Sequence, residues 1–481
     1  MQLFNTLSRE KEEFVPLKNG EVGMYTCGPT VYNFPHLGNL RTYIFEDILK
    51  RTLIYNGLKV NHVMNITDVG HLTSDADEGE DKLEKEAKIE GKGPLEIADF
   101  YTKAFKQDLS HLNILPPNIY CAASDHIKEQ IELIKKLIEK GFAYDTPEAV
   151  YFEVPKFKDY TKLSGQEIAE KIVGAREEVE IGAHKKNPED FVLWFKLVGK
   201  YKNHILRWAS PWGEGFPGWH IECSAMSMKY LGEQFDVHCG GVDHINVHHT
   251  NEIAQSEAAT GKSPWVKYWL HGEFLVIKGG EKMAKSAGNF LTLKNSFIEK
   301  NLNPLAYRYA TLQTHYRKQM EYTDEVAQGA QNGLNNLYKE IEKISSLAGA
   351  SKFFSRIKIK MTKPDKIFLE KFLSKINNDL NMPEAVALVH ELLKSNLLAQ
   401  EKSATLLDFD KVLGLDFTKH IFSSQAEQVL TPEHKSLIEQ RERARAEKNW
   451  QKSDEIRKQL EKEGVILEDT QEGTKWHVDK K

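Results

Sequence analysis

The spacing of apolar side chains in the first part of the chain predicts a β-α-β unit. Val22–Thr26 is a short apolar strand, and Leu40–Tyr55 then carries apolar residues at the three- and four-residue intervals of an amphipathic helix. Leu58–Ile66 returns as an apolar, partly β-branched strand. In an open parallel sheet, ligands bind beyond the carboxyl ends of the strands, which are the positions that Cys27 and Thr67 occupy.

Longer amphipathic patterns dominate the second half of the chain. Asn301–Arg317 predicts a helix that leaves the α/β part, and from Thr323 to about Ala426 apolar residues recur at the spacing of a helical bundle. Within that predicted bundle, Arg356–Lys366 is basic, which fits a phosphate contact and a solvated linker equally well. The segment Thr431–Trp476 combines two charged helical stretches with a strand segment.

Composition narrows the class of protein. The chain has 481 residues, of which 40% are hydrophobic and 28% charged, as in globular proteins of about two to four domains. The formal net charge of −5 carries no global nucleic-acid signature, so any RNA contact has to be local. Four cysteines do not make a disulfide framework and favour a reducing compartment. Because no signal-peptide core and no apolar run of about eighteen residues occurs, we expect a cytoplasmic protein without membrane contact.

One thiol, several imidazoles and a carboxylate fall close together between Gly218 and Glu252. His248 and Glu252 lie four residues apart in a segment of helical composition, so both side chains share one helix face. With Cys223, and with Cys27 brought in by chain folding, they offer the mixed soft and hard ligands that suit zinc. A lone buried cysteine is also a common core residue, and a His/Glu pair is also a common solvated face. The absence of H-E-x-x-H argues against a zinc peptidase.

A first candidate for a nucleotide site is PHLGN, at the start of the predicted helix. Free backbone N–H groups at a helix N-terminus attract phosphate, and Gly38 permits close approach of a ligand to the backbone. His36 and Asn39 supply side-chain donors. Neither G-x-G-x-x-G nor a P-loop is present to explain nucleotide binding otherwise. A plain helix cap with a surface histidine is the competing interpretation.

A second candidate is KMAKS, which follows the predicted apolar strand Tyr268–Ile277 and two glycines. Lys282 and Lys285 in a mobile loop can close over a triphosphate and stabilise the charge on leaving pyrophosphate. A solvated lysine loop is the alternative.

HLGN and KMAKS, in that order, resemble the two signatures of class I aminoacyl-tRNA synthetases. The stretches TCGPTVYNFPHLGNLR, NITDVGH, DFVLWFK, SPWGEGFPGWHIECSAM, HHTNEIAQS and KMAKSAGNF together resemble the cysteinyl-tRNA synthetases, from about Leu3 to Trp476. The resemblance implies an α/β fold with a Rossmann-type parallel-sheet catalytic domain over residues 1–315, with an insert at about 94–207. A helical bundle over 316–426 and a small C-terminal anticodon-binding domain over 427–481 are expected to follow.

The resemblance also implies roles for single residues. One zinc ion per chain is expected at Cys27, Cys223, His248 and Glu252, where it binds the thiolate of the substrate. The remaining roles are catalysis by His36, Asn39, Lys282 and Lys285, nucleotide binding by Gly38, His238, Asp243 and Lys285, and closure around cysteine by Thr67 and Trp219. Arg445, Trp450, Asp454 and Asp469 match positions expected to face the anticodon. Trp450 as a core residue is the competing interpretation.

Physical logic supports a metal in this role. An apolar pocket separates cysteine from serine or alanine by only about 1–3 kcal/mol. A bond between zinc and sulfur has no equivalent for a methyl group, and a hydroxyl is a poorer ligand. We therefore expect no separate editing domain, and the insert is too short for one.

Several positions depart from the family pattern. Asn39 replaces an ionisable histidine and Ala284 replaces a serine, but both lysines of KMAKS are kept, so we expect activity to persist. Cys239, where glycine is more usual, is expected near the pocket but not on the metal, and Cys121 is expected to be structural. The acidic loop at 70–82 is either a lid or plain surface.

The expected reaction joins L-cysteine to tRNA(Cys) through a cysteinyl-adenylate. The carboxylate of cysteine, already ionised at neutral pH, attacks the α-phosphorus of ATP, whose phosphates carry Mg²⁺. We expect a monomer. The rival hypotheses are a cysteine ligase acting on an amino sugar, which the full C-terminal tail disfavours, and a non-catalytic zinc protein that binds RNA. A hydrolytic zinc enzyme lacks a carboxylate base beside a ligand histidine.

Overall fold

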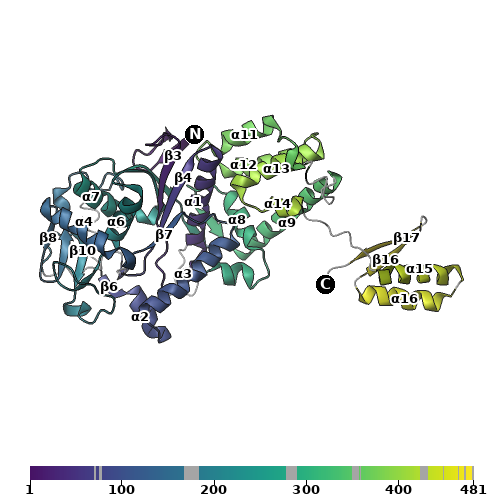
Figure 1. The fold of residues 1–481 in the computed structure, drawn as a ribbon, viewed down its shortest axis with the longest axis horizontal. Helices are drawn as coiled ribbons and strands as arrows, with labels where there is room; N and C mark the ends of the chain where they lie inside the picture. The colour runs from purple at the N-terminus through teal and green to yellow at the C-terminus, as the bar shows by residue number, and fades with distance from the viewer. Residues whose placement is uncertain are drawn as a thin grey trace.

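The computed structural model describes residues 1–69, 72–74, 78–166, 184–277, 290–348, 357, 359–422, 432–447, 449–463, 465–470 and 473–478. Within these residues the central sheet is parallel and has five strands (Figure 1). Their order across the sheet is β13 (Val266–Gly272), β12 (Phe235–Gly241), β3 (Glu21–Thr26), β4 (Lys59–Ile66) and β7 (Ile119–Ala122). The predicted α/β fold with a parallel sheet is confirmed.

Helices cover both faces of this sheet because successive strand side chains point to opposite sides. Met24 packs in one apolar cluster with α1 (Leu37–Tyr55), whereas Tyr25 packs in a second cluster with Cys223 of α6 (Trp219–Leu231). The helix α7 (His248–Thr260) packs against α6. The predicted β-α-β unit is present as β3, α1 and β4, although α1 begins three residues earlier than the apolar spacing indicated.

An antiparallel sheet interrupts the parallel one along the chain. In the described residues its strands are β11 (Gly215–Pro217), β10 (Phe191–Lys196), β9 (Ala149–Phe152) and β8 (Ala143–Asp145), in that order across the sheet. Before it come β5 (Leu72–Ser74), β6 (Glu78–Asp81), α2 (Lys82–Glu90), α3 (Pro94–His111) and α4 (Ile127–Glu139). The strand β7 lies between α3 and α4 in sequence but belongs to the central sheet.

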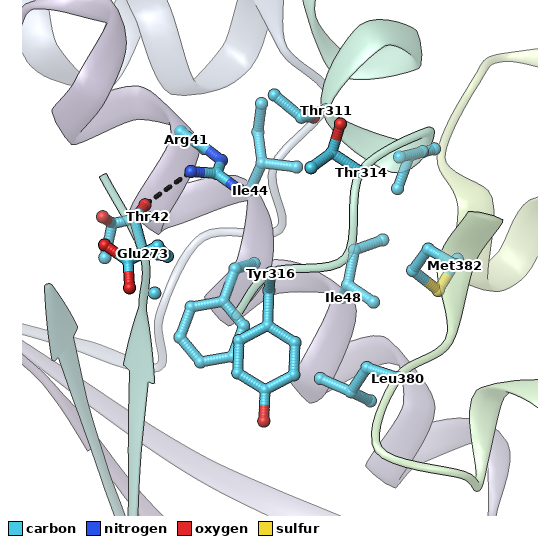
Figure 2. A pocket seen from close by; sticks show the side chains of 13 residues that line it. Arg41, Thr42, Ile44, Ile48, Glu273, Thr311, Thr314, Tyr316, Leu380 and Met382 are labelled. Carbon is cyan, nitrogen blue, oxygen red and sulfur yellow. Dashed lines mark hydrogen bonds between the residues drawn. The ribbon is translucent and has the colours of Figure 1, made fainter. Parts of the chain in front are cut away.

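The predicted strand Tyr268–Ile277 is two strands in the structure. β13 ends at Gly272, and β14 (Leu275–Ile277) pairs with β15 (Met320–Tyr322) instead. The break falls where the buried guanidinium of Arg41 donates to the main-chain carbonyl of Glu273 at 2.6 Å (Figure 2). It also donates to the carbonyl of Phe274. The same guanidinium donates to the carbonyl of Lys318, whereas the Phe274 carbonyl also accepts from the Met320 N–H of β15 at 3.1 Å. At the break between the two strands, a side chain therefore supplements the backbone pairing.

Helices of the second half pack against the α1 side of the sheet. They are α8 (Pro304–Leu312), α9 (Asp324–Leu347), α11 (Lys366–Ile376), α12 (Met382–Lys394), α13 (Ala399–Leu413) and α14 (Phe417–Ile421). Phe372 and Ile376, two apolar residues within the predicted bundle, are fully buried. Buried Arg308 links the α/β part of the chain to these helices, because it donates to Asp47 of α1 at 2.6 Å and to the Leu413 carbonyl of α13 at 2.7 Å.

The chain ends in a small unit with its own core, the C-terminal unit (residues 432–478). It consists of α15 (Pro432–Ala446), α16 (Trp450–Lys462), β16 (Val465–Thr470) and β17 (Gly473–Val478), drawn in yellow in Figure 1. Ile456, Leu460, Val465 and Leu467 form its buried apolar cluster. Among the helices that the structure describes, none is both long and apolar enough to cross a lipid bilayer.

Candidate functional site

A cavity of about 270 Å³ opens at the carboxyl ends of the central strands. Its walls come from the segments after β3, β4 and β12 and from the starts of α1, α6 and α7. The predicted site residues that line it are Cys27, His36, Asn39, Thr67, Trp219, Cys223, Asp243 and His248. Residues more than 200 positions apart in the sequence therefore meet in one place.

Cys27, Cys223, His248 and Glu252, the four-donor cluster, converge at the inner end of this cavity. One donor atom from each residue lies within 4.8 Å of the others, and all four residues are buried. Cys27 follows β3, where its N–H donates to the Cys239 carbonyl at 3.2 Å. The pair on α7 lies on one helix face, as its four-residue spacing predicts.

A second group of four donors shares two members with the cluster. It consists of Cys27, His238, His249 and Glu252. Cys223 and His248 line the cavity, whereas His238 and His249 do not. Three members of the four-donor cluster, Cys27 included, therefore line the cavity, whereas Cys27 is the one member of the second group in its described lining.

Two donors of the four-donor cluster, Glu252 and Cys223, have pKa values lowered towards their anionic forms, whereas the pKa values of Cys27 and His248 are raised, so these two keep a proton that a metal has to displace. Burial raises the pKa of Glu252, but His238 and His248 outweigh it and bring that pKa to about 2. Burial lowers the pKa of His248, but the Glu252 carboxylate outweighs it and raises that pKa to about 10. Burial raises the pKa of Cys223, yet hydrogen bonding with Cys27 and the charge of His248 bring it to about 6. Thiolate, carboxylate and imidazole donors of this kind suit zinc better than magnesium or calcium.

Histidines behind the cluster hold its ligands in place. Thr6 Oγ1 lies 2.8 Å from His271 Nδ1, and His271 Nε2 lies 2.8 Å from His249 Nδ1. If the Thr6 hydroxyl donates, each ring accepts on one nitrogen and donates on the other, so His249 directs an N–H at Cys27 Sγ, 3.3 Å away. Sequence patterns did not predict this series of hydrogen bonds, although the dense run of histidines is its signal.

His238 takes a supporting position as well. It is fully buried, and its Nε2 lies 2.9 Å from Glu252 Oε2. It does not line the cavity, whereas Asp243, its partner in the predicted nucleotide group, does. The role of His238 in nucleotide binding stays a prediction.

The HLGN segment forms the N-terminus of α1. His36 is the N-cap: its Nδ1 accepts from the Asn39 N–H at 3.1 Å, and its own N–H donates to Asn39 Oδ1 at 3.2 Å. Burial lowers the pKa of His36 to about 4, so the ring is neutral and keeps its Nε2 proton as a donor. The substitution of asparagine at position 39 thus completes a capping box.

The second signature cannot be placed against the first. Lys282, Lys285 and Ala284 lie outside the described residues. Phe290, four residues after the end of KMAKS, lines the cavity and packs edge-on against His36 with ring centroids 5.6 Å apart.

Two further predicted residues flank the cluster. The Trp219 ring stacks on the His248 ring with centroids 4.1 Å apart, and Thr67 Oγ1 donates to Glu222 Oε2 at 3.0 Å. Cys239 and Cys121 are buried and are absent from the described lining of the cavity.

The predicted anticodon residues lie on the C-terminal unit. Trp450 is 59% exposed at the start of α16, and Asp454 is exposed one turn later. Arg445 is half-buried on α15. Asp469 lies in β16 opposite Thr474, and its side chain is outside the described part.

Comparisons with known proteins agree with this layout. The family model described as "tRNA synthetases class I (C) catalytic domain" matches residues 13–332, and that described as "Cysteinyl-tRNA ligase anticodon binding domain" matches residues 427–476. The chain is 46% identical over 494 residues to the cysteine–tRNA ligase of Treponema denticola, with 99% of each chain covered. It is 42% identical over 497 residues to that of Thermus thermophilus, again with 99% of each covered.

Solved structures show the same fold at low identity. Methionyl-tRNA synthetase of Mycobacterium tuberculosis, in complex with methionyl-adenylate, aligns with a TM-score of 0.57 and 15% identity over 85% of this chain and 93% of that one. The leucyl enzyme of Agrobacterium radiobacter K84 aligns with a TM-score of 0.55 and 11% identity over 85% of each chain. With the full-length relatives, these findings show that the chain belongs to the cysteine–tRNA ligases, ATP-using enzymes of the class I aminoacyl-tRNA synthetases that join cysteine to tRNA.

Proposed function

We propose that this chain charges tRNA(Cys) through a cysteinyl-adenylate and selects cysteine with a zinc ion held by the four-donor cluster. The observation that carries the proposal is the convergence of two thiols, an imidazole and a carboxylate at the inner end of a cavity that opens at the strand ends. Cys223 and His248 face that cavity, so a ligand entering it reaches the cluster directly.

The donors of the cluster fit zinc by their chemistry. When bound, zinc supplies a Lewis-acidic position that takes the thiolate of the substrate in preference to a hydroxyl or a methyl group. Residues of the protein shape the site around the metal. Trp219 stacks on His248 and closes one side of the pocket, and His238 holds the carboxylate of Glu252. This arrangement supports discrimination against serine and alanine in a single step.

Activation of the amino acid needs no general base in the protein, because the cysteine carboxylate is ionised at neutral pH. At the α1 N-terminus the Leu37 N–H donates to the Leu291 carbonyl and the Asn39 N–H to His36 Nδ1, so within the described residues the Gly38 N–H is left for an ATP phosphate. Glycine at this position lets the phosphate approach the backbone. His36 and Asn39 line the cavity at this helix end. We assign to Lys282 and Lys285 the stabilisation of the negative charge that develops on pyrophosphate. Mg²⁺ is expected on the phosphates of ATP.

Transfer to tRNA then uses the rest of the chain. The acyl group passes from the adenylate to the terminal ribose of tRNA(Cys), and the C-terminal unit reads the anticodon. The exposure of Trp450 and Asp454 and the match over residues 427–476 support this role, and both favour tRNA over an amino sugar as acceptor. We expect the chain to act as a monomer.

X-ray absorption at the zinc edge tests the metal assignment. One zinc per chain with two sulfur ligands, from Cys27 and Cys223, is expected in the free protein. Addition of cysteine should raise the sulfur count to three, and addition of serine should leave it unchanged. An unchanged count with cysteine contradicts thiolate selection by the metal.

Cysteine-dependent exchange between pyrophosphate and ATP tests the enzymatic part. The wild-type protein should show exchange, and Lys285→Ala should lose it by about a hundredfold or more while keeping its zinc. Lys294→Ala, at an exposed lysine paired with Glu299, is the matched control and should retain exchange. Failure of the wild-type protein to charge tRNA(Cys) transcript would exclude the proposed function.

A further inference from the structure

A chain of hydrogen bonds runs along one wall of the cavity, beside the four-donor cluster. The Gly28 N–H donates to Asn65 Oδ1 at 2.7 Å, and Asn65 Nδ2 donates to Thr67 Oγ1 at 3.0 Å. Thr67 Oγ1 in turn donates to Glu222 Oε2 at 3.0 Å. Gly28, Asn65 and Thr67 line the cavity, whereas Glu222 lies behind them.

The direction of this chain is set at its first bond. A backbone N–H can only donate, so the side-chain oxygen of Asn65 faces Gly28 and its NH₂ group faces Thr67. The Thr67 hydroxyl therefore accepts from Asn65, and its own proton lies towards Glu222 Oε2. Burial raises the pKa of Glu222 well above its usual range, so this carboxyl is protonated, and the direction of the bond from Thr67 puts that proton on Oε1. A hydroxyl has one proton and two lone pairs, so what Thr67 retains for a ligand is one acceptor lone pair.

The position of Glu222 suits a contact with the Thr67 hydroxyl alone, within the described residues. Its side chain is fully buried, and Thr67 is the hydrogen-bond partner that the described residues give to its carboxyl group. The neighbouring buried carboxylate, Asp68, is occupied by the N–H of Ser124 at 2.9 Å and by its hydroxyl.

Close contact between two strand ends keeps the Gly28 N–H and the Asn65 side chain within hydrogen-bond distance. A Cβ atom at position 28 would lie 1.7 Å from the main-chain oxygen of Asn65, so the segment after β3 lies directly against the end of β4. Any residue larger than glycine would push these segments apart and separate the Gly28 N–H from the Asn65 amide.

We infer that Glu222 is a positioning residue for substrate binding, which orients the Thr67 hydroxyl so that it accepts a hydrogen bond from the α-ammonium group of cysteine. The inference rests on the proposed function and adds to it the polarity of the amino-acid site. An acceptor at Thr67 attracts the ammonium group and turns away the carboxylate, which is then free to face the α1 N-terminus. With the thiol at the four-donor cluster, the three contacts also distinguish L-cysteine from D-cysteine.

Substitution of Glu222 combined with a substrate analogue tests the inference. Glu222→Met removes the acceptor at similar length and is expected to raise the KM for cysteine about tenfold, with little change in kcat or in the KM for ATP. 3-Mercaptopropionate keeps the thiol and the carboxylate but has no ammonium group. Its inhibition constant against labelled cysteine in the charging assay should stay within about twofold of wild type. Glu222→Gln, which keeps an acceptor oxygen, should stay within about threefold of the wild-type KM.

A double substitution shows whether Glu222 acts through Thr67. Thr67→Val should also raise the KM for cysteine, and Thr67→Val combined with Glu222→Met should be no worse than Thr67→Val alone. Additive effects, or an equal loss of affinity for cysteine and for 3-mercaptopropionate, would overturn the inference. Should Glu222→Met fail to fold, Thr67→Val carries the comparison of the two ligands, with the same selective loss for cysteine expected.

Zinc content and wild-type activity separate this inference from the proposed function. If the wild-type chain binds no zinc or does not activate cysteine, the proposed function fails. If the wild type is active and each variant keeps one zinc per chain while the KM for cysteine stays unchanged in Glu222→Met, the inference alone fails.

Discussion

The four-donor cluster and the C-terminal unit place their functional residues in opposite environments. Cys27 is 6% exposed and Glu252 is fully buried, with donors drawn from three separate segments around the central sheet. Trp450 is 59% exposed, and the unit that carries it has a small apolar core of its own. In the first region the functional side chains are part of the interior, whereas in the second they stand on its surface.

This difference decides how function and stability are coupled. Buried thiols and carboxylates have to be compensated by partners or by a cation, so a change in one of them alters both the fold and the chemistry. An exposed aromatic side chain contributes little to folding and is available to a partner. Substitutions in the two regions should therefore behave differently in the same assays.

The largest effect is expected from Cys223→Ser. The hydroxyl is a poorer ligand, so zinc content and cysteine-dependent exchange should fall together, exchange by about a thousandfold. Metal analysis and pyrophosphate exchange measure this. Cys121→Ser is the matched control, since that thiol is also buried but donates to the Met64 carbonyl, as a hydroxyl can. Retention of zinc and activity by Cys223→Ser would remove the contrast between the regions.

A smaller loss, confined to tRNA charging, is expected from Leu460→Ala. Truncation of a fully buried leucine costs about 2–5 kcal/mol, which a core of this size does not offset. Charging should fall by about a hundredfold while pyrophosphate exchange stays within about twofold of wild type. Glu461→Ala, at the exposed neighbouring position, should leave both unchanged. A parallel fall in exchange would show that the two regions are not independent.

Trp450→Ala should separate binding from folding within the C-terminal unit. Loss of one stacking platform is worth about 1–3 kcal/mol, so kcat/KM for tRNA should fall about tenfold or more. The melting temperature should remain that of the wild type, because the ring is largely exposed. Gln451→Ala is the control on the next exposed position. A lower melting temperature with unchanged charging would make Trp450 a core residue instead.

The smallest effect is a pH dependence of stability at His36. Its pKa is about 4 in the folded chain against a usual 6.5, so between these values the unfolded chain binds more protons. The stability contribution of His36 is therefore lost as the pH falls from 6.5 towards 4, and it is constant above 6.5. In urea unfolding, the wild type should lose more stability than His36→Asn on going from pH 7.5 to pH 5. Equal losses would contradict a half-buried, neutral imidazole.

Local patterns were enough to predict much of the fold around the site. Short apolar runs identified β3 and β4, and helical spacing identified α1 and placed His248 and Glu252 on one face. These predictions work because side-chain direction along a strand or a helix follows from backbone geometry alone. The same reasoning merged β13 and β14 into one strand, because local spacing does not reveal that Arg41, more than 200 positions earlier, satisfies the Glu273 carbonyl at the break.

The sequence by itself determined which chemistry is available: the donor types, the two signature motifs and the family to which they point. Only the tertiary structure decided which donors meet. In the folded chain Cys223 and His248 line the cavity, whereas His238 and His249 do not. The fold also directs the Thr67 hydroxyl towards Glu222. The physical reason is that donor types are local properties of the chain, whereas distance, burial and hydrogen-bond direction depend on contacts between residues far apart in sequence.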